Sequence, residues 1–100
     1  MKIFIFSTKP YEKILFNEIN NKHELIFTES TLNPDTIVNA KGADGICCFV
    51  TDRVNKFIIN KLIDMNIKFI VLRSAGFDHV DILYAKSKGI TVCRTPKYSP

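Results

Sequence analysis

The segment RSAGFD, residues 73–78, combines the residue types that can bind an anion. Gly76 allows the backbone to turn tightly, and the N–H groups of Ala75 and Gly76 then become available near the start of the following helix. A substrate carboxylate is one anion that such groups could hold. A structural interpretation also stands, in which Gly76 only forms the turn, Asp78 caps the helix and Arg73 is a solvated strand end.

Cysteines and histidines provide no metal site or catalytic cluster in this sequence. Cys47 and Cys48 are adjacent in an apolar run and Cys93 lies in another, so we expect all three to pack as small apolar side chains. No CxxC pair or paired disulfide framework is present, which favours a reducing compartment, the cytoplasm. We expect His79 to lie on the surface, in the first turn of a helix. No apolar stretch is long enough to span a membrane.

Short apolar runs alternate with longer amphipathic segments, which is typical of βα units around a parallel sheet. Strands are predicted over residues 2–6, 25–28, 45–50, 68–72 and 90–93. Helices are predicted over residues 10–20 and 34–40, from Asn55 onward, and from the region of Asp78 and Asp81 up to Gly89. The apolar stripes of the last two helices comprise Phe57, Ile58, Leu62 and Met65, and Val80, Leu83 and Tyr84.

This order of elements predicts an α/β fold, a flavodoxin-like three-layer sandwich. Its five parallel strands would run in the order 2-1-3-4-5 with helices on both faces, because right-handed crossovers leave few alternatives. Ligands of such sheets bind beyond the carboxyl ends of the strands. The residues of interest are therefore 7–10, 49–53, 73–78 and 94–99.

Three sites that this fold often carries are not supported by the residues at those ends. A phosphate-receiving signalling site needs clustered carboxylates, but Ser7 and Thr8 follow the first strand and only Asp52 follows the third. A flavin-phosphate loop would be rich in glycine, whereas here Pro10 removes a backbone donor. The GxGxxG and P-loop patterns are also absent, so these residues should not bind NAD tightly.

The composition fits one small globular domain. The chain has 100 residues, of which 46% are hydrophobic and 24% charged. Its net charge of +4 is spread along the chain without a dense basic run, so we expect neither a nucleic-acid partner nor a membrane partner.

Several linked motifs are similar to a known family. LRSAGFDHVD at residues 72–81 is followed by Ala85-Lys86, by Gly89-Ile90 and by PKYSP at residues 96–100, and GADG at residues 42–45 adds support. Together they resemble the N-terminal part of the D-isomer-specific 2-hydroxyacid dehydrogenases, most of all the D-lactate dehydrogenase branch.

The resemblance implies that residues 1–100 are a substrate-domain segment, with NAD bound by a Rossmann domain absent from this chain. The implied reaction is hydride exchange between NAD(H) and a small 2-oxo acid, with pyruvate and D-lactate as the favoured pair. Ala75 and Gly76 would bind the substrate carboxylate, and Tyr98 and Phe49 would line the cleft, Phe49 where the lactate branch often has tyrosine. The family's catalytic arginine, glutamate and histidine lie beyond residue 100, so we expect no catalytic residue or metal site here.

Two further expectations follow from the resemblance, and one alternative stays open. The full-length protein is expected to be a homodimer, and the 100 residues alone are expected to be inactive. The alternative is a stand-alone flavodoxin-like binding module without catalysis. The sequence does not decide between NAD and NADP, or which 2-oxo acid is preferred.

Overall fold

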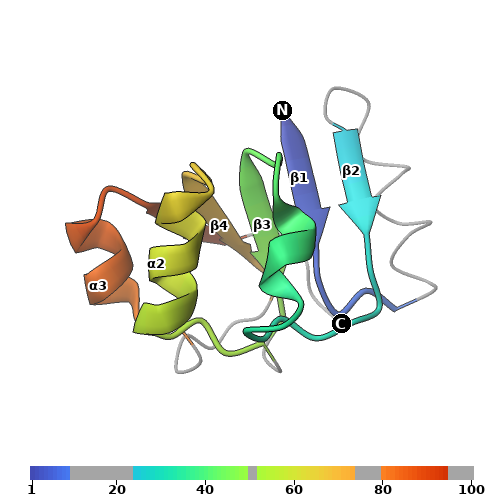
Figure 1. Cartoon of the computed structure of the whole chain (residues 1–100), viewed down its shortest axis with the longest axis horizontal. Helices are drawn as coiled ribbons and strands as arrows, with labels where there is room; N and C mark the ends of the chain where they lie inside the picture. Colours follow the sequence, from blue (N-terminus) through green and yellow to red (C-terminus); the bar gives the residue numbers. More distant parts are fainter. Residues whose placement is uncertain (10–23, 50–51, 74–79, 95–100) are drawn as a thin grey trace.

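Five short strands form one parallel sheet in the predicted order β2-β1-β3-β4-β5 (Figure 1). The computed structural model describes residues 1–9, 24–49, 52–73 and 80–94. The strands are β1 (Lys2–Ile5), β2 (Glu24–Phe27), β3 (Gly45–Cys48), β4 (Phe69–Leu72) and β5 (Thr91–Arg94). The helix predicted for residues 10–20 lies outside the described residues. The predicted topology is confirmed, and it brings the carboxyl ends of β1, β3 and β4 to one edge of the sheet.

The described helices are η1 (Ile37–Ala40), a 3₁₀ helix, α2 (Lys56–Asp64) and α3 (Ile82–Ser87). Figure 1 shows α2 beside α3, and α2 contacts both η1 and α3. The buried side chains of α2 join the strands in one apolar core. The central members of this core from α2, β3 and β4 are Ile58, Ile59, Leu62, Ile46, Cys48, Ile70 and Leu72.

The central strand β3 is buried along its whole length, as a strand covered on both faces should be. Its first residue, Gly45, pairs with Phe69 of β4. A Cβ atom at Gly45 would collide with the Phe69 ring, so the aromatic ring occupies the space that a side chain would need. A side chain at position 45 would therefore force the Phe69 ring to move.

The helix ends follow the predicted capping chemistry at two places. The Asn55 side chain accepts a hydrogen bond from the Ile58 N–H at 3.0 Å, and the Asp81 side chain accepts one from the Tyr84 N–H at 3.1 Å. Gly89, with φ of 82°, follows α3 in the left-handed conformation that ends helices. The N-cap at Asn55, the helix start at Asp81 and the stop at Gly89 are confirmed, whereas Asp78 lies outside the described residues.

The helix predicted over residues 34–40 is shorter than expected. Only Ile37–Ala40 is helical, and it is a 3₁₀ helix. The Asn33 side chain accepts hydrogen bonds from the N–H groups of Asp35 at 2.8 Å and Thr36 at 3.0 Å. Asn33 thus caps the turn that precedes the 3₁₀ helix, because the first N–H groups of a helical turn have no acceptor within it.

Two residues of the predicted apolar stripes are not in the core. Phe57 is 50% exposed and Leu83 is 84% exposed. In α2 the buried face is formed by Ile58, Ile59 and Leu62, which turns Phe57 outward. In α3 only Ala85 is fully buried, since this helix has six residues and touches the sheet through a small contact. Helical spacing therefore located both helices correctly but did not identify their buried faces in full, since it included Phe57 and Leu83.

Among the described residues, no helix has the length and apolar content to cross a membrane. That same part of the chain holds no group of three or more histidine, cysteine, aspartate or glutamate side chains arranged to bind a metal ion.

Candidate substrate site at the carboxyl edge of the sheet

Three polar residues and one aromatic residue follow neighbouring strands at the edge where ligands of such sheets bind. Ser7 lies two residues beyond β1, Phe49 directly follows β3, and Arg73 directly follows β4. Asp52 lies three residues after Phe49. Of these, Ser7, Asp52 and Arg73 are buried, Asp52 with none of its surface exposed and Arg73 with 2%. Burial of one acidic and one basic side chain at this edge requires hydrogen bonds that replace water.

Asp52 receives three hydrogen bonds from three different segments. The Ser7 hydroxyl donates to Oδ1 at 2.6 Å, and the Leu32 N–H donates to the same oxygen at 2.9 Å. The Phe49 N–H donates to Oδ2 at 2.7 Å. Because charged acceptors form short, strong hydrogen bonds, this carboxylate ties together the chain after β1, after β2 and after β3.

Ser7 has a backbone conformation that is uncommon for a residue other than glycine. Its φ is 54°, in the left-handed region. Its N–H donates to the Ser30 carbonyl at 2.9 Å, and its hydroxyl donates to Asp52. Such a conformation persists only where surrounding contacts fix it, as they do here.

Arg73 is buried, so its interpretation as a solvated strand end is wrong. Its Nη2 donates to the Ser7 carbonyl at 3.0 Å, and the guanidinium carbon lies 5.4 Å from the centre of the Phe49 ring. Nη1 lies 3.9 Å from the Cys47 sulfur. The planar guanidinium group can stack on an aromatic ring while it donates from its edge, which explains how Arg73 contacts the Phe49 ring and the Ser7 carbonyl together. Arg73 therefore connects the end of β4 with the ends of β1 and β3.

The two thiols of β3 behave as predicted, and the third does not. Cys47 and Cys48 are buried. Burial raises the pKa of the Cys48 thiol strongly, Cys47 and Asp52 raise it further, and Arg73 opposes them. Cys93 is exposed, contrary to the prediction that it packs in the core, although partial burial still raises its pKa. The raised pKa values leave little thiolate at Cys48 and Cys93 at neutral pH, so these two thiols are poor nucleophiles.

The structure places one of the four predicted substrate-binding residues. Phe49 lies at the carboxyl edge, partly buried, with its ring against Arg73. Ala75, Gly76 and Tyr98 lie outside the described residues. So does His79.

Sequence reasoning missed the bonded set of Ser7, Asp52 and Arg73. It considered Ser7 and Asp52 only as a defective metal or phosphate site. A signal was available, because a charged residue directly after a buried parallel strand must be neutralised or hydrogen-bonded by its neighbours. The spacing along the chain does not reveal the partners, since 45 residues separate Ser7 from Asp52 and 66 separate Ser7 from Arg73.

A family model agrees with this architecture over almost the whole chain. Residues 3–100 match the catalytic domain of the D-isomer specific 2-hydroxyacid dehydrogenases. The chain belongs to this family. The match to the family model confirms the resemblance that was inferred from the linked motifs.

Individual dehydrogenases of this family are similar along the entire chain. The 2-hydroxyacid dehydrogenase homolog 1 of Schizosaccharomyces pombe is 45% identical over all of this chain, which covers 31% of that protein. The apo structure of D-lactate dehydrogenase from Escherichia coli has a TM-score of 0.93 at 36% identity, again over 100% of this chain and 32% of that one. The D-lactate dehydrogenase of Lactobacillus jensenii, solved with NAD+, has a TM-score of 0.83 at 30% identity, over 100% of this chain and 31% of that one. The chain thus spans about a third of the length of these dehydrogenases.

The described residues of this dehydrogenase segment do not fit a dinucleotide. The sequence lacks GxGxxG. At the end of β1 the hydroxyl of Ser7 donates to Asp52, and that of Thr8 donates to the Ile5 carbonyl at 3.0 Å. Both hydroxyls are therefore engaged within the protein, and no glycine follows them to open the backbone for a phosphate.

Proposed function

We propose that this chain forms the substrate side of an enzyme that transfers a hydride between NAD(H) and a small 2-oxo acid, with pyruvate and D-lactate as the pair. The observation that carries this proposal is the end-to-end similarity to D-lactate dehydrogenases, with a TM-score of 0.93 for the enzyme of Escherichia coli. In this proposal residues 1–100 are a substrate-domain segment, and a Rossmann domain elsewhere in the full-length protein binds NAD. The functional protein is a homodimer.

The N–H groups of Ala75 and Gly76 bind the substrate carboxylate in this proposal, and Tyr98 and Phe49 line the cleft. Two described features support that placement. Phe49 lies at the carboxyl edge of the sheet with its ring against Arg73. Arg73 directly precedes the proposed carboxylate-binding turn and is held by its hydrogen bond to the Ser7 carbonyl. The residue before the proposed turn is therefore held in place, which would reduce the reorganisation needed to present the N–H groups of the turn to an anion.

The contribution of this segment is binding and orientation, since we assign no catalytic residue to it. Its carboxyl edge carries a buried cation, Arg73, which directly precedes the proposed carboxylate-binding turn in the sequence. A positive charge in a poorly solvated position favours the approach of an anionic substrate. The groups that donate and accept the proton are proposed to lie in the rest of the protein.

Steady-state kinetics of the full-length protein test this proposal. We expect NADH oxidation with pyruvate and formation of D-lactate but not L-lactate. A panel of 2-oxo acids with longer side chains then defines the preferred substrate, and NADPH defines the cofactor choice. The isolated 100 residues should show no turnover. Absence of NADH oxidation with every 2-oxo acid would overturn the proposal and favour a binding module without catalysis.

A further inference from the structure

We propose that Asp52 is a positioning residue that fixes Phe49 and thereby sets which 2-oxo acid side chains the enzyme accepts. This inference rests on the proposed function, because it assigns a consequence to the cleft that Phe49 would line. The inference goes beyond the proposed function because it assigns a role in substrate selection to Asp52, a fully buried carboxylate that the substrate cannot touch.

Asp52 forms hydrogen bonds with both the N–H and the carbonyl of Phe49. The Phe49 N–H donates to Asp52 Oδ2 at 2.7 Å, and the Asp52 N–H donates to the Phe49 carbonyl at 2.9 Å. The other carboxylate oxygen is occupied by the Ser7 hydroxyl and the Leu32 N–H. The carboxylate is thus anchored by two segments that do not belong to the Phe49 loop, so it transmits their rigidity to Phe49.

The ring of Phe49 is held independently by Arg73. The guanidinium carbon lies 5.4 Å from the ring centre, and Nη2 donates to the Ser7 carbonyl. Ser7 in turn donates its hydroxyl to Asp52. These contacts connect four residues in a closed circuit, which we call the Asp52 network: Asp52, Ser7, Arg73 and Phe49. Within it Phe49 is the most exposed member, and the other three are buried.

The left-handed φ of Ser7 adds a second sign that the Asp52 network is selected for geometry. A serine at φ of 54° is disfavoured, and a glycine would relieve this strain. Glycine, however, would remove the hydroxyl that donates to Asp52. Serine at this position keeps the hydrogen bond to Asp52 although its backbone conformation is strained. This is expected where the orientation of the Asp52 side chain matters.

Asp52→Asn is the most informative change because it keeps the shape of the side chain. The amide has one acceptor oxygen instead of two, and its NH2 group would face an N–H or hydroxyl donor. Phe49 would then lose its fixed position while the fold keeps its packing. A more mobile Phe49 should admit larger substrates, because a pocket excludes a larger substrate only where the lining side chains cannot move away from it.

The experiment compares kcat/KM for pyruvate with kcat/KM for a branched 2-oxo acid of five or six carbons in the full-length protein. We expect the ratio of the two to fall about tenfold in Asp52→Asn, comparable with the discrimination that one or two methylene groups provide. Affinity for NADH should not change. The matched control is Asp64→Asn, at the exposed C-terminal end of α2, which should leave the ratio unchanged.

A merely structural role for Asp52 gives a different result. Loss of folded enzyme lowers both kcat/KM values by the same factor, so the ratio does not move, and this result would overturn the proposal. If Asp52→Asn fails to fold, Ser7→Ala removes a single donor from Asp52. We then expect a shift of the ratio in the same direction by about threefold, smaller than for Asp52→Asn because the Leu32 and Phe49 N–H groups still bind the carboxylate. An unchanged ratio again overturns the proposal.

Hydrogen exchange separates this inference from the proposed function. In Asp52→Asn the Phe49 amide should exchange at least about tenfold faster than in the unaltered protein, while amides of β4 keep their protection. If the unaltered protein oxidises no NADH with any 2-oxo acid, the proposed function fails. Faster exchange at Phe49 then still supports its positioning by Asp52, and unchanged exchange overturns it.

Discussion

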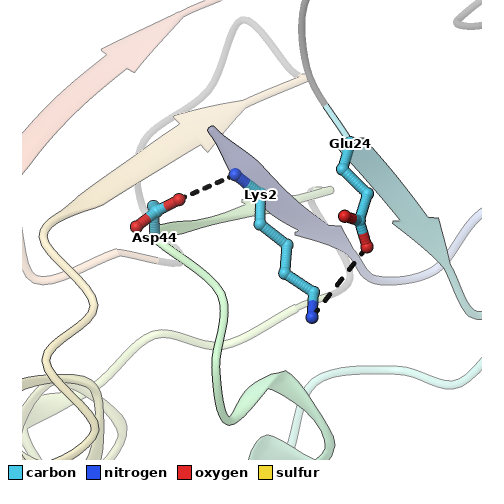
Figure 2. A network of polar contacts seen from close by, with 3 residues as sticks. All are labelled: Lys2, Glu24 and Asp44. Atoms are coloured by element: carbon cyan, nitrogen blue, oxygen red, sulfur yellow. Dashed lines mark hydrogen bonds and ion pairs between the residues drawn. The ribbon is translucent and has the colours of Figure 1, made fainter.

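The two ends of the parallel sheet carry charged residues in opposite environments. At the carboxyl edge Asp52 and Arg73 are buried and hydrogen-bonded into the Asp52 network. At the amino edge Lys2, Glu24 and Asp44 form the exposed contacts that Figure 2 shows. The Lys2 ammonium lies 3.9 Å from Glu24, and these side chains are 38% and 66% exposed. Similar residue types therefore serve different purposes at the two edges.

Charged side chains contribute to stability differently at the two edges of the sheet. Water solvates the amino-edge charges whether or not they pair, so their interaction adds little to stability. At the carboxyl edge the protein replaces water with donors from several segments, and loss of any partner leaves others buried and unsatisfied. We expect substitutions of the same chemistry to have large effects at the carboxyl edge and small effects at the amino edge.

Asp52→Ala should produce the largest effect. It removes the shared acceptor of the Ser7 hydroxyl and of the Leu32 and Phe49 N–H groups. Because each buried donor left unsatisfied costs about 1–3 kcal/mol, the free energy of unfolding should fall by about 4 kcal/mol. Urea unfolding followed by circular dichroism measures this change. A loss below about 1 kcal/mol would mean that water reaches the carboxyl edge and that the two edges are alike.

The pH dependence of stability should report the same exclusion of water from the carboxyl edge. Cys48 has an ordinary thiol pKa of 9.0 when unfolded, and burial raises it strongly in the folded state. Above pH 9.0 the unfolded chain therefore loses a proton that the folded protein keeps, so the stability contributed by Cys48 is present below this pH and is lost as pH rises.

The Cys48→Ala variant isolates this contribution from other groups that titrate at high pH. Above pH 9 the free energy of unfolding of the unaltered protein should fall by about 1 kcal/mol per pH unit relative to that of the variant. Parallel stability curves for the two proteins would show that the thiol titrates normally in the folded state. Urea unfolding at several pH values between 7 and about 10.5 provides the measurement.

The strands and the topology could be predicted from the sequence because their cause is local. β3 reads as a continuous apolar run, and it is buried at every position. Asn55 and Asp81 are N-caps whose side chains bond to N–H groups three residues ahead, a contact fixed by nearby sequence. The buried faces of the helices were less well predicted, as Phe57 and Leu83 show, since a short helix is oriented by its contact with the sheet.

The candidate site was only partly predictable because its contacts are long-range. Phe49 was correctly placed at the carboxyl edge, since any residue directly after a parallel strand lies there. The burial of Arg73 depends on a hydrogen bond to a carbonyl 66 residues away, and that of Asp52 on donors 20 and 45 residues away. No periodicity or local propensity encodes these partners.

Asp44→Ala repeats the aspartate-to-alanine change at the amino edge and should have a modest effect. Asp44 Oδ2 accepts the Lys2 N–H at 2.7 Å, but the contact is exposed, so water replaces the lost acceptor. We expect a loss of about 1 kcal/mol in the free energy of unfolding, the net value of one hydrogen bond. Urea unfolding beside Asp52→Ala gives a direct comparison. Equal losses at positions 44 and 52 would contradict the contrast between the edges.

Glu24→Gln should have the smallest effect of all. It keeps the side-chain length of residue 24 and removes only the attraction to the Lys2 ammonium, which is long at 3.9 Å and exposed. We expect the free energy of unfolding to fall by about 0.3 kcal/mol at low salt. No change is expected near 1 M salt, where the Debye length is about 3 Å and exposed charges further apart are screened. Thermal unfolding at the two salt concentrations measures it. A salt-independent loss above about 1 kcal/mol would show that this pair is shielded from water, and the amino edge would then share the energetic character of the Asp52 network.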